Sequence, residues 1–391
     1  MKYRLVGLLS LGHLATDINQ GALPALLPFF ISEHHLSYKA AAGLVFAASI
    51  ASLVVQPLFG HFADRLSKPW LMPTGLLLAG IGLAFTGIVP NYRMIVLAVV
   101  VSGIGIAAFH PEGARLVNYV GGEKKATAMS MFAVGGSLGF AIGPLIATTA
   151  LISWGLKGTL ILIVPMTMMV IILVGQLSRF PMGGRNLKEK KAGPTIEIAQ
   201  DAWGPFTRLT ATVICRSILF YGLNTFLPLY WINVLHQSNA TAGTALTILF
   251  MAGVIGTLLG GRLADYLGHR RVLLIGFVTL IPLLPILISV SDESMATVLL
   301  VPIGLALFAI YSPMVVMGQK YLPNRIGLAS GVTLGVAVAI GGVASPLFGW
   351  IADHHGIRAA LMGVVFLPVL AAGLTLTLPD PKILLKQGSI L

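Results

Sequence analysis

Three ionisable residues lie inside apolar segments that are long enough to cross a bilayer: Asp17, Glu112 and Arg216. A charge near the middle of a spanning helix costs about 2.5–3.5 kcal/mol on insertion scales, so such residues usually face a protein interior or a water-filled cavity. A carboxylate held there can bind a proton on one side of the membrane and release it on the other, and a guanidinium can bind an anion. These residues therefore indicate a polar pathway through a membrane protein, and hence transport.

Asp17 is the first candidate for a proton carrier, and a structural hydrogen bond to a neighbouring helix is the alternative. His110 and Glu112 flank Pro111, which removes a backbone donor and favours a kink that aims side chains into a cavity. Glu112 and Arg115 are spaced i, i+3 and can pair on one helix face. Protonation of Glu112 would then free Arg115 for a substrate anion, whereas a permanent ion pair is the alternative. His110 could relay protons near neutral pH or hold substrate.

Arg216 has no acidic neighbour within one helical turn. Its partner must come from another helix, with Asp17 as the candidate in the other half, or from the substrate. A planar guanidinium suits a phosphonate or a carboxylate. We also expect nearby polar side chains to contact substrate, namely His13, Gln20, Tyr221, Asn224 and Tyr311.

The composition indicates a membrane protein. Only 10% of the residues are charged and the mean hydropathy is +0.91, whereas a soluble domain carries about 25% charged residues. Apolar runs of roughly 20 residues, the length of a spanning helix, recur along the chain. They lack the alternation of a membrane β-barrel, so helices are expected. The twelve predicted spans are 5–31, 38–63, 71–90, 93–118, 124–152, 157–178, 206–235, 240–264, 271–289, 294–320, 325–352 and 357–378.

The positive charges predict the orientation. With both termini in the cytoplasm, 20 of the 25 Lys and Arg residues fall on the cytoplasmic side, as the positive-inside rule requires. The exceptions are Lys39, Arg93, Lys157 and Arg358 on the outer side and Arg216 within a span. The net charge of +12 thus mostly reflects the excess of Lys and Arg on the cytoplasmic side. These basic residues are scattered over short loops, which argues against nucleic-acid binding. Contacts with anionic lipid are expected instead.

The chain reads as two copies of one half. The polar stretch 179–205 separates a predicted six-helix bundle, 1–178, from a second, 206–391. The halves align at an offset near 201, and parallel six-helix repeats are a known transporter plan with the substrate site between them. The matching pairs are Pro28 with Pro228, Asp64 with Asp265, Pro111 with Pro313, and Pro144 with Pro346.

A loop motif occurs at equivalent places in the two halves. Glycine allows close helix approach, and an aspartate at a helix end can pair with loop arginines or cap a neighbouring helix. The motif therefore predicts a latch that holds the halves together in one state and releases them in the other, with a plain topological charge cluster as the alternative. Its residues are Gly60, Asp64 and Arg65, and Gly261, Asp265, Arg270 and Arg271.

This loop resembles the signature of the major facilitator superfamily. Other segments resemble the fosmidomycin-resistance family of bacterial efflux proteins: His13-Leu-Ala-Thr-Asp17, Gln56-Pro57, Pro69-Trp70-x-x-Pro73-x-Gly75, Phe109-His110-Pro111-Glu112 and Leu322-Pro-Asn-Arg325-Ile-Gly327. The resemblance implies a monomeric drug/proton antiporter of the bacterial inner membrane that alternates between inward- and outward-open states. Helices 1, 4, 7 and 10 would line its cavity. The energy source would be the proton gradient, with no cofactor. The substrate that the family resemblance implies is a phosphonate such as fosmidomycin.

Two further segments bear on that resemblance. Gly139-x-x-x-Gly143-Pro144 is similar to part of the antiporter motif of the superfamily, although Ala147 and Thr148 stand where a glycine pair would follow. Many drug antiporters carry an arginine early in helix 4, where Val99 stands here. Either the role of that arginine is absent here or other residues fill it, and Arg115, one turn after Glu112, is the candidate.

Other functions remain as alternatives. A proton symporter that imports an organic anion or a sugar fits the same fold and charges. A membrane enzyme or sensor is disfavoured, because the sequence shows no nucleotide-binding loop, nucleophile arrangement or polar signalling domain. No metal site is expected: His34-His35 and His354-His355 lie at outer helix ends, and adjacent helical residues point about 100° apart. The one cysteine, Cys215, excludes an internal disulfide framework.

Overall fold

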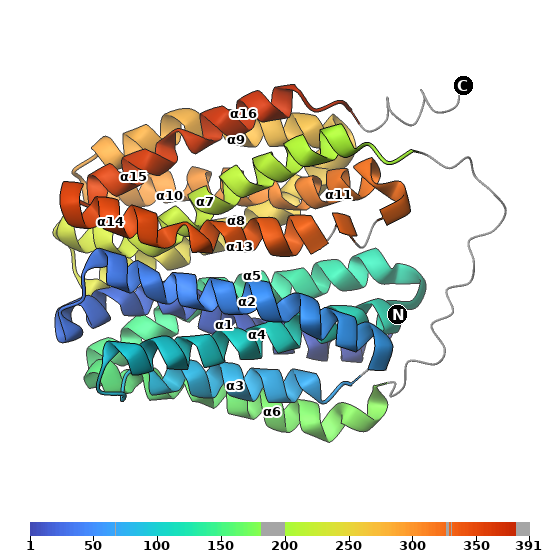
Figure 1. The fold of residues 1–391 in the computed structure, drawn as a ribbon, viewed down its shortest axis with the longest axis horizontal. Coiled ribbons are helices and arrows are strands. Elements are labelled where there is room, and N and C mark those ends of the chain that lie inside the picture. The colour runs from blue at the N-terminus through green and yellow to red at the C-terminus, as the bar shows by residue number, and fades with distance from the viewer. Residues whose placement is uncertain (67, 181–199, 326–327, 330, 381–391) are drawn as a thin grey trace.

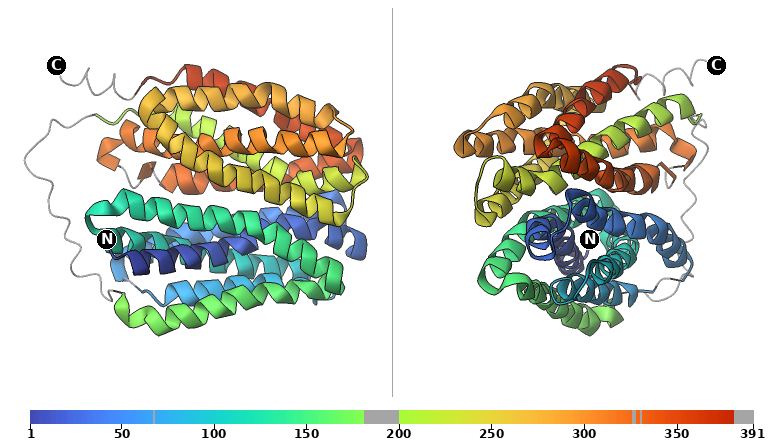
Figure 2. Two further views of the ribbon diagram at one scale, coloured as in Figure 1. Left: turned by 180° about the vertical axis from the view of Figure 1, so that it is seen from behind. Right: turned by 60° about the vertical axis from the view of Figure 1, so that its left-hand side comes forward.

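The computed structural model of the chain describes residues 1–66, 68–180, 200–325, 328–329 and 331–380. The regular elements in these ranges are all helices, which run along the long axis of the molecule (Figure 1). The helices α1 to α6 form one bundle, and α7 to α16 form a second bundle beside it (Figures 1 and 2). The predicted all-helical class is confirmed, whereas most of the predicted linker 179–205 lies outside the described residues.

The first bundle contains six long helices, with a 3₁₀ segment before the sixth: α1 Tyr3–His34, α2 Tyr38–Leu66, α3 Leu71–Phe85, α4 Tyr92–Gly121, α5 Lys125–Trp154, η2 Gly155–Leu162 and α6 Ile163–Gln176. The second bundle begins with four helices: α7 Trp203–Asn233, α8 Asn239–Leu267, α9 His269–Ser289 and α10 Glu293–Ala309. It ends with shorter segments: α11 Tyr311–Tyr321, the π-helix η5 Gly331–Val336, α13 Ala337–Val343, α14 Ser345–His355, α15 Ile357–Val365 and α16 Leu367–Leu376.

Prolines divide the last three predicted spans. The predicted helix 294–320 is interrupted between α10 and α11, three residues before Pro313. The junctions α13–α14 and α15–α16 likewise lie within two residues of Pro346 and Pro368. Proline has no N–H and its ring clashes with the carbonyl four residues earlier, so a helix breaks or kinks just before it.

Large apolar side chains cover the outside of both bundles. Leu97, Ile171, Val298 and Phe366 are each more than 60% exposed. Such a surface suits lipid rather than water. Among the described residues, eight helices are long and apolar enough to cross a membrane. The chain is therefore a multi-pass membrane protein, while the count of twelve crossings stays a prediction.

The two bundles touch along α5 and α8 and along α2, α13 and α14. The start of α1 and the end of α16 lie at one end of the molecule (Figure 1), which we call the terminal end. At the other, distal end, the Asp353 carboxylate of α14 accepts hydrogen bonds from the backbone N–H groups of Tyr38, at 2.7 Å, and Lys39, at 3.0 Å. A side chain at Gly349 would lie 2.7 Å from the Cα of Lys39. The bundles are thus closely packed at the distal end.

Candidate functional site

Asp17 lies at the centre of a buried cluster with two histidines. The residue lies on α1 and is 4% exposed. Oδ2 lies 3.2 Å from Nε2 of His13, one turn earlier on the same helix, and Oδ1 lies 3.2 Å from Nε2 of His110 on α4. Gln20 Nε2 also donates to Oδ1, at 3.3 Å. The structure therefore brings together Asp17 and His110, which lie 93 positions apart in the sequence.

Backbone carbonyls determine which ring nitrogens carry a hydrogen. Nδ1 of His13 is 2.7 Å from the carbonyl of Phe132, and Nδ1 of His110 is 2.9 Å from that of Ile106. A carbonyl oxygen can only accept, so each Nδ1 must be the donor. In a neutral histidine the Nε2 atom is then a bare lone pair, which faces the Asp17 carboxylate. Each contact with Asp17 becomes a hydrogen bond only when a further proton is bound.

Two glycines of α5 let this cluster form. A Cβ at Gly136 would lie 2.5 Å from Cε1 of His13 and 2.6 Å from Oδ2 of Asp17, and a Cβ at Gly139 would lie 2.9 Å from Cβ of Asp17. Helix α5 therefore approaches α1 so closely at Asp17 that no side chain fits between them. Gly139 belongs to the antiporter-like motif, so the structure gives that motif a packing role beside Asp17.

Glu112 and Arg115 form the ion pair that their spacing predicts. Nε of Arg115 donates to Oε2 of Glu112 at 2.9 Å, and one terminal nitrogen donates to Oε1 at 2.5 Å. This bidentate geometry is the strong form of the pair. The Glu112 side chain is completely buried.

Arg216 lies on α7 and is 5% exposed. Its Nε donates to the carbonyl of Leu307 at 3.0 Å, and its Cζ lies 4.7 Å from the ring centre of Tyr311 and 5.9 Å from that of Phe308. Within the described residues no carboxylate lies within ion-pair distance of Arg216. The alternative of a pair with Asp17 is absent from this structure, because Asp17 contacts the two histidines instead.

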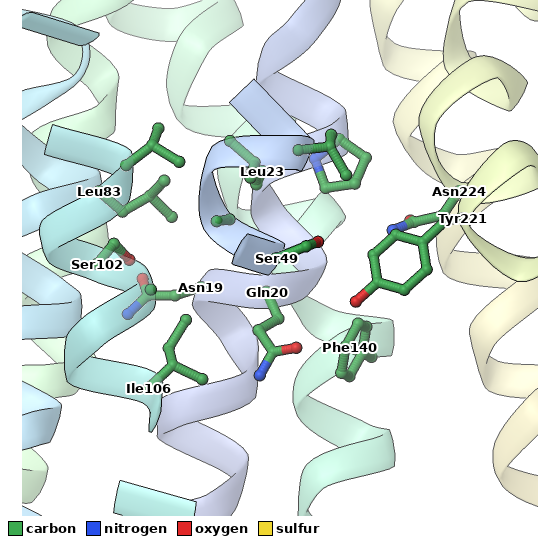
Figure 3. A pocket seen from close by; sticks show the side chains of 15 residues that line it. Asn19, Gln20, Leu23, Ser49, Leu83, Ser102, Ile106, Phe140, Tyr221 and Asn224 are labelled. Atoms are coloured by element: carbon green, nitrogen blue, oxygen red, sulfur yellow. The ribbon is translucent and has the colours of Figure 1, made fainter. Parts of the chain in front are cut away.

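A cavity of about 70 Å³ lies among helices of the first bundle and is bordered by α7 of the second (Figure 3). Its lining residue Gln20 donates to Asp17. Three expected substrate contacts, Gln20, Tyr221 and Asn224, line the cavity. The other expected contacts, His13, Arg115, Arg216 and Tyr311, do not line this cavity. The other lining residues were not predicted, and the polar ones among them are Asn19, Ser49 and Ser102. Asn19 could have been found, because an amide two residues after Asp17 is unusual in an apolar run, whereas single serines and phenylalanines give no such signal.

The predicted latch is described only in the second half. The side chains of Gly60, Asp64 and Arg65 lie outside the described residues. In the second half, Gly261 lies on α8, and Asp265 and Arg271 are exposed. Arg270 donates to the carbonyls of Thr375 and Leu376 at the end of α16, at 3.2 and 2.6 Å. These contacts fix α9 to α16 within one bundle, and the latch between bundles stays a prediction.

The cluster also offers metal ligands. One ligand atom each from His13, Asp17 and His110 lie within 4.8 Å of one another, and two imidazoles with a carboxylate could hold a divalent ion. The expectation of no metal site rested on the histidine pairs at the helix ends and on the lack of a ligand cluster in the sequence, and it did not foresee this arrangement.

Known transporters resemble the chain over nearly its whole length. It is 29% identical over 390 residues to the fosmidomycin resistance protein of Escherichia coli (strain K12), covering 97% of this chain and 94% of that protein. It is 28% identical over 386 residues to an uncharacterized transporter, YfnC, of Bacillus subtilis (strain 168), with the same coverage. The resemblance inferred from the motifs is thus confirmed.

Solved structures show the same fold. A bacterial homologue of the human lysosomal transporter Spinster, in an inward-facing and occupied conformation, superimposes with a TM-score of 0.81 at 17% identity and covers 96% of each chain. A mutant of the nucleoside transporter NupG gives a TM-score of 0.77 at 13% identity and covers 95% of this chain and 98% of that one. The family model of the Major Facilitator Superfamily matches residues 9–346. The chain therefore belongs to the Major Facilitator Superfamily of membrane transporters.

Proposed function

We propose that this transporter exports a small anionic compound in exchange for protons, by alternating access in a bacterial inner membrane. The observation that carries the proposal is the pair of Nε2 atoms facing the Asp17 carboxylate. The Nδ1 hydrogens of the two histidines are donated to the carbonyls of Phe132 and Ile106. Hydrogen bonds between the two Nε2 atoms and Asp17 therefore need added protons. A buried group that requires protons is what coupling to a proton gradient needs.

Protonation would act on the packing of α1 against α4. His13 and Asp17 belong to α1, whereas His110 belongs to α4. With a proton on Nε2 of His110, an imidazolium–carboxylate pair holds the helices together, and without it a lone pair faces the carboxylate. Loss of the proton therefore favours separation of the two helices. Glu112 provides a second proton-sensitive contact, because its protonation would weaken the pair with Arg115.

Arg216 would bind the anion. It is buried, its aromatic neighbours supply no formal charge, and a guanidinium matches the planar or trigonal oxygens of carboxylates and phosphonates. The name of the E. coli relative suggests fosmidomycin as the first compound to test. We further propose cytoplasmic termini, function as a monomer, and no partner besides substrate, protons and lipid.

Purified protein in proteoliposomes tests this proposal. Labelled fosmidomycin should move against its gradient when a pH gradient is imposed, in the direction opposite to the protons. Movement in the same direction as the protons would establish the symporter alternative. In cells, expression should lower accumulation of the compound, and a rise in accumulation would contradict export.

A further inference from the structure

Three side chains around Asp17 have the chemistry and the spacing of metal ligands. One ligand atom each from His13, Asp17 and His110 lies within 4.8 Å of the other two. The Nε2 atom of each ring is 3.2 Å from a carboxylate oxygen. A tetrahedral Zn²⁺ with ligands at about 2.0–2.2 Å holds neighbouring ligand atoms roughly 3.3 Å apart. The observed contacts therefore have the separation expected of neighbouring zinc ligands.

Each ligand is also held by the kind of group that orients ligands in known metal sites. The Nδ1 atoms of the two rings donate to the carbonyls of Phe132 and Ile106, at 2.7 and 2.9 Å. A histidine that binds a metal through one nitrogen almost always donates its other N–H to a carbonyl, a carboxylate or water. Gln20 donates to the carboxylate at 3.3 Å, and ligating carboxylates are likewise hydrogen-bonded. The Nε2 lone pairs and the carboxylate are thus positioned in advance.

Packing fixes the two rings in the cluster. The ring of His13 stacks on Phe132 with ring centres 4.0 Å apart, and it meets the ring of His110 edge-on with centres 5.0 Å apart. Gly136 leaves no free space beside His13, because a Cβ at Gly136 would lie 2.5 Å from Cε1 of the ring. An ion that binds here therefore orders few additional side-chain rotamers, which lowers the entropic cost of binding.

The types of ligand select the class of ion. Two imidazoles and a carboxylate match the ligands that zinc takes in open sites, where a water molecule completes the tetrahedron. Mg²⁺ and Ca²⁺ prefer oxygen ligands. The side chains of His13 and His110 are 12% and 19% exposed, so the cluster is not sealed against an ion and its water molecule. The fitting occupant is therefore a transition-metal dication.

From these observations we propose that His13, Asp17 and His110 form a binding site for a transition-metal dication such as Zn²⁺. Two of the ligands belong to α1 and one belongs to α4, so the bound ion joins these helices. The binding site does not depend on the proposed function. Its effect on transport does, because an ion that holds α1 to α4 would inhibit a cycle in which loss of a proton lets the two helices separate.

Metal binding is tested on tag-free purified protein in phosphatidylcholine nanodiscs. Zn²⁺ is titrated by calorimetry, and Co²⁺, which takes similar ligands and absorbs visible light, is titrated by absorption. We expect one equivalent to bind at the cluster and to raise the melting temperature, because the ion binds only the folded protein. Millimolar Mg²⁺ should not compete.

Variants on both helices locate the ion. Loss of a group that orients a metal ligand costs roughly 10- to 100-fold in affinity, so Gln20→Leu should bind Zn²⁺ at least about tenfold more weakly. His110→Gln on α4 and His13→Gln on α1 remove a ligand, and each should weaken binding by at least about 100-fold. If one of these two variants fails to fold, as judged by gel filtration, the other decides the result.

His354→Gln is the matched control. His354 is exposed at the distal end, and its Nδ1 contacts the carbonyl of Trp350 at 2.9 Å. This variant should bind Zn²⁺ as tightly as the unmodified protein. Absence of saturable binding would overturn the proposal. Unchanged affinity in the cluster variants would also overturn it, because the ion would then bind elsewhere, as at the exposed histidines.

Transport separates this proposal from the proposed function. Proton-driven transport of labelled fosmidomycin in proteoliposomes should fall at least about tenfold when Zn²⁺ saturates the site, and EDTA should restore it. A metal buffer sets the free Zn²⁺, so that the fraction of drug bound to zinc is known. Unchanged transport with zinc bound at the cluster would retain the site and contradict the separation of α1 from α4. Absence of fosmidomycin transport without Zn²⁺ would contradict the proposed function alone, and the binding measurements would still decide the metal site.

Discussion

His110 determines what Asp17 can do. Without it, Asp17 would have one histidine on its own helix, and its protonation would have no direct effect on another helix. With it, the carboxylate lies between a ring on α1 and a ring on α4. Stacking of His13 on Phe132, with ring centres 4.0 Å apart, keeps the first of these rings in place. A single proton can therefore alter a contact between helices.

At the residue scale, Asp17→Asn should abolish proton-driven accumulation while retaining substrate exchange. The amide of asparagine carries no negative charge, so a protonated histidine cannot form an ion pair with it. Exchange of labelled for unlabelled substrate need not cycle a proton. We expect accumulation of fosmidomycin in proteoliposomes to fall at least about tenfold and exchange to change by about threefold or less. Glu112→Gln is measured alongside, with His354→Gln at the exposed distal end as the control. Normal accumulation in both Asp17→Asn and Glu112→Gln would contradict the role of these two carboxylates as proton carriers.

Arg216→Lys tests whether shape matters in addition to charge. Lysine keeps the positive charge but loses the planar fork of donors and the stacking on Tyr311. A charge-assisted hydrogen bond contributes about 1.5–3 kcal/mol, so binding of the simple anion propylphosphonate, measured by calorimetry, should weaken by roughly 10- to 100-fold. Arg216→Gln should bind still more weakly. Wild-type affinity in the lysine variant would mean that the guanidinium does not contact the anion.

Sequence reasoning found the charged members of the site more readily than the neutral ones. Asp17, Glu112 and Arg216 stand out because a charge in an apolar run is costly and therefore rare. His13 was expected to contact substrate, although its i, i+4 spacing from Asp17 already allowed the observed pair. The contact between His110 and Asp17 joins separate helices, so only the packing of α1 against α4 could reveal it. Ser49 and Ser102 were missed because serine is ordinary in membrane helices.

At the scale of elements, the approach of α5 to α1 controls the geometry of the Asp17 cluster. Much of the course of the helices was predictable, since the apolar runs mark most of them. The interruptions in α10–α11, α13–α14 and α15–α16 were not predicted, although their prolines are visible in the sequence. Proline also occurs inside continuous helices here, as at Pro111 in α4 and Pro144 in α5. The presence of a proline alone therefore does not tell where a membrane helix divides.

Gly136→Ala should impair transport through this contact. The added methyl group would lie within 2.6 Å of both His13 and Asp17, so the cluster must move. Overpacking typically costs about 1–3 kcal/mol, and we expect a lower melting temperature together with at least a tenfold loss of proton-driven transport. The control is Gly175→Ala in α6, where a Cβ meets nothing within 4 Å. That variant should be as stable as the parent or slightly more stable, because alanine favours a helix. Equal behaviour of the two variants would contradict the packing role of α5.

At the scale of the whole molecule, hydrogen bonds join the bundles at the distal end. Asp353 of the second bundle caps α2 of the first by accepting from two of its backbone N–H groups. In the proposed alternating-access cycle, these contacts must break when the distal end opens. The conformation described here is therefore closed at the distal end, which the predicted topology places outside the cell.

Asp353→Ala should shift the molecule toward the state that is open at the distal end. Loss of a helix cap costs about 1 kcal/mol, which corresponds to roughly a fivefold change in population. Spin labels on cysteines at Ser153 and Ser294, in a Cys215→Ser background, should show a larger fraction of long distances. Asp292→Ala is the control, because Asp292 caps α10 within one bundle by accepting from the N–H of Met295. An unchanged distance distribution in Asp353→Ala would exclude a gating role for this cap.

The donors to Asp353 are main-chain groups, and this has a consequence for inhibitors. Any substitution at positions 38 and 39 except proline leaves both N–H groups in place. The cap therefore tolerates changes of side chain at these two positions of α2. A compound that binds between α2 and α14 and displaces the Asp353 carboxylate would compete with its hydrogen bonds to the backbone of α2. Few substitutions can strengthen these hydrogen bonds. Resistance to such a compound should then arise mainly around position 353 itself, where a change also weakens the closure on which the transport cycle depends.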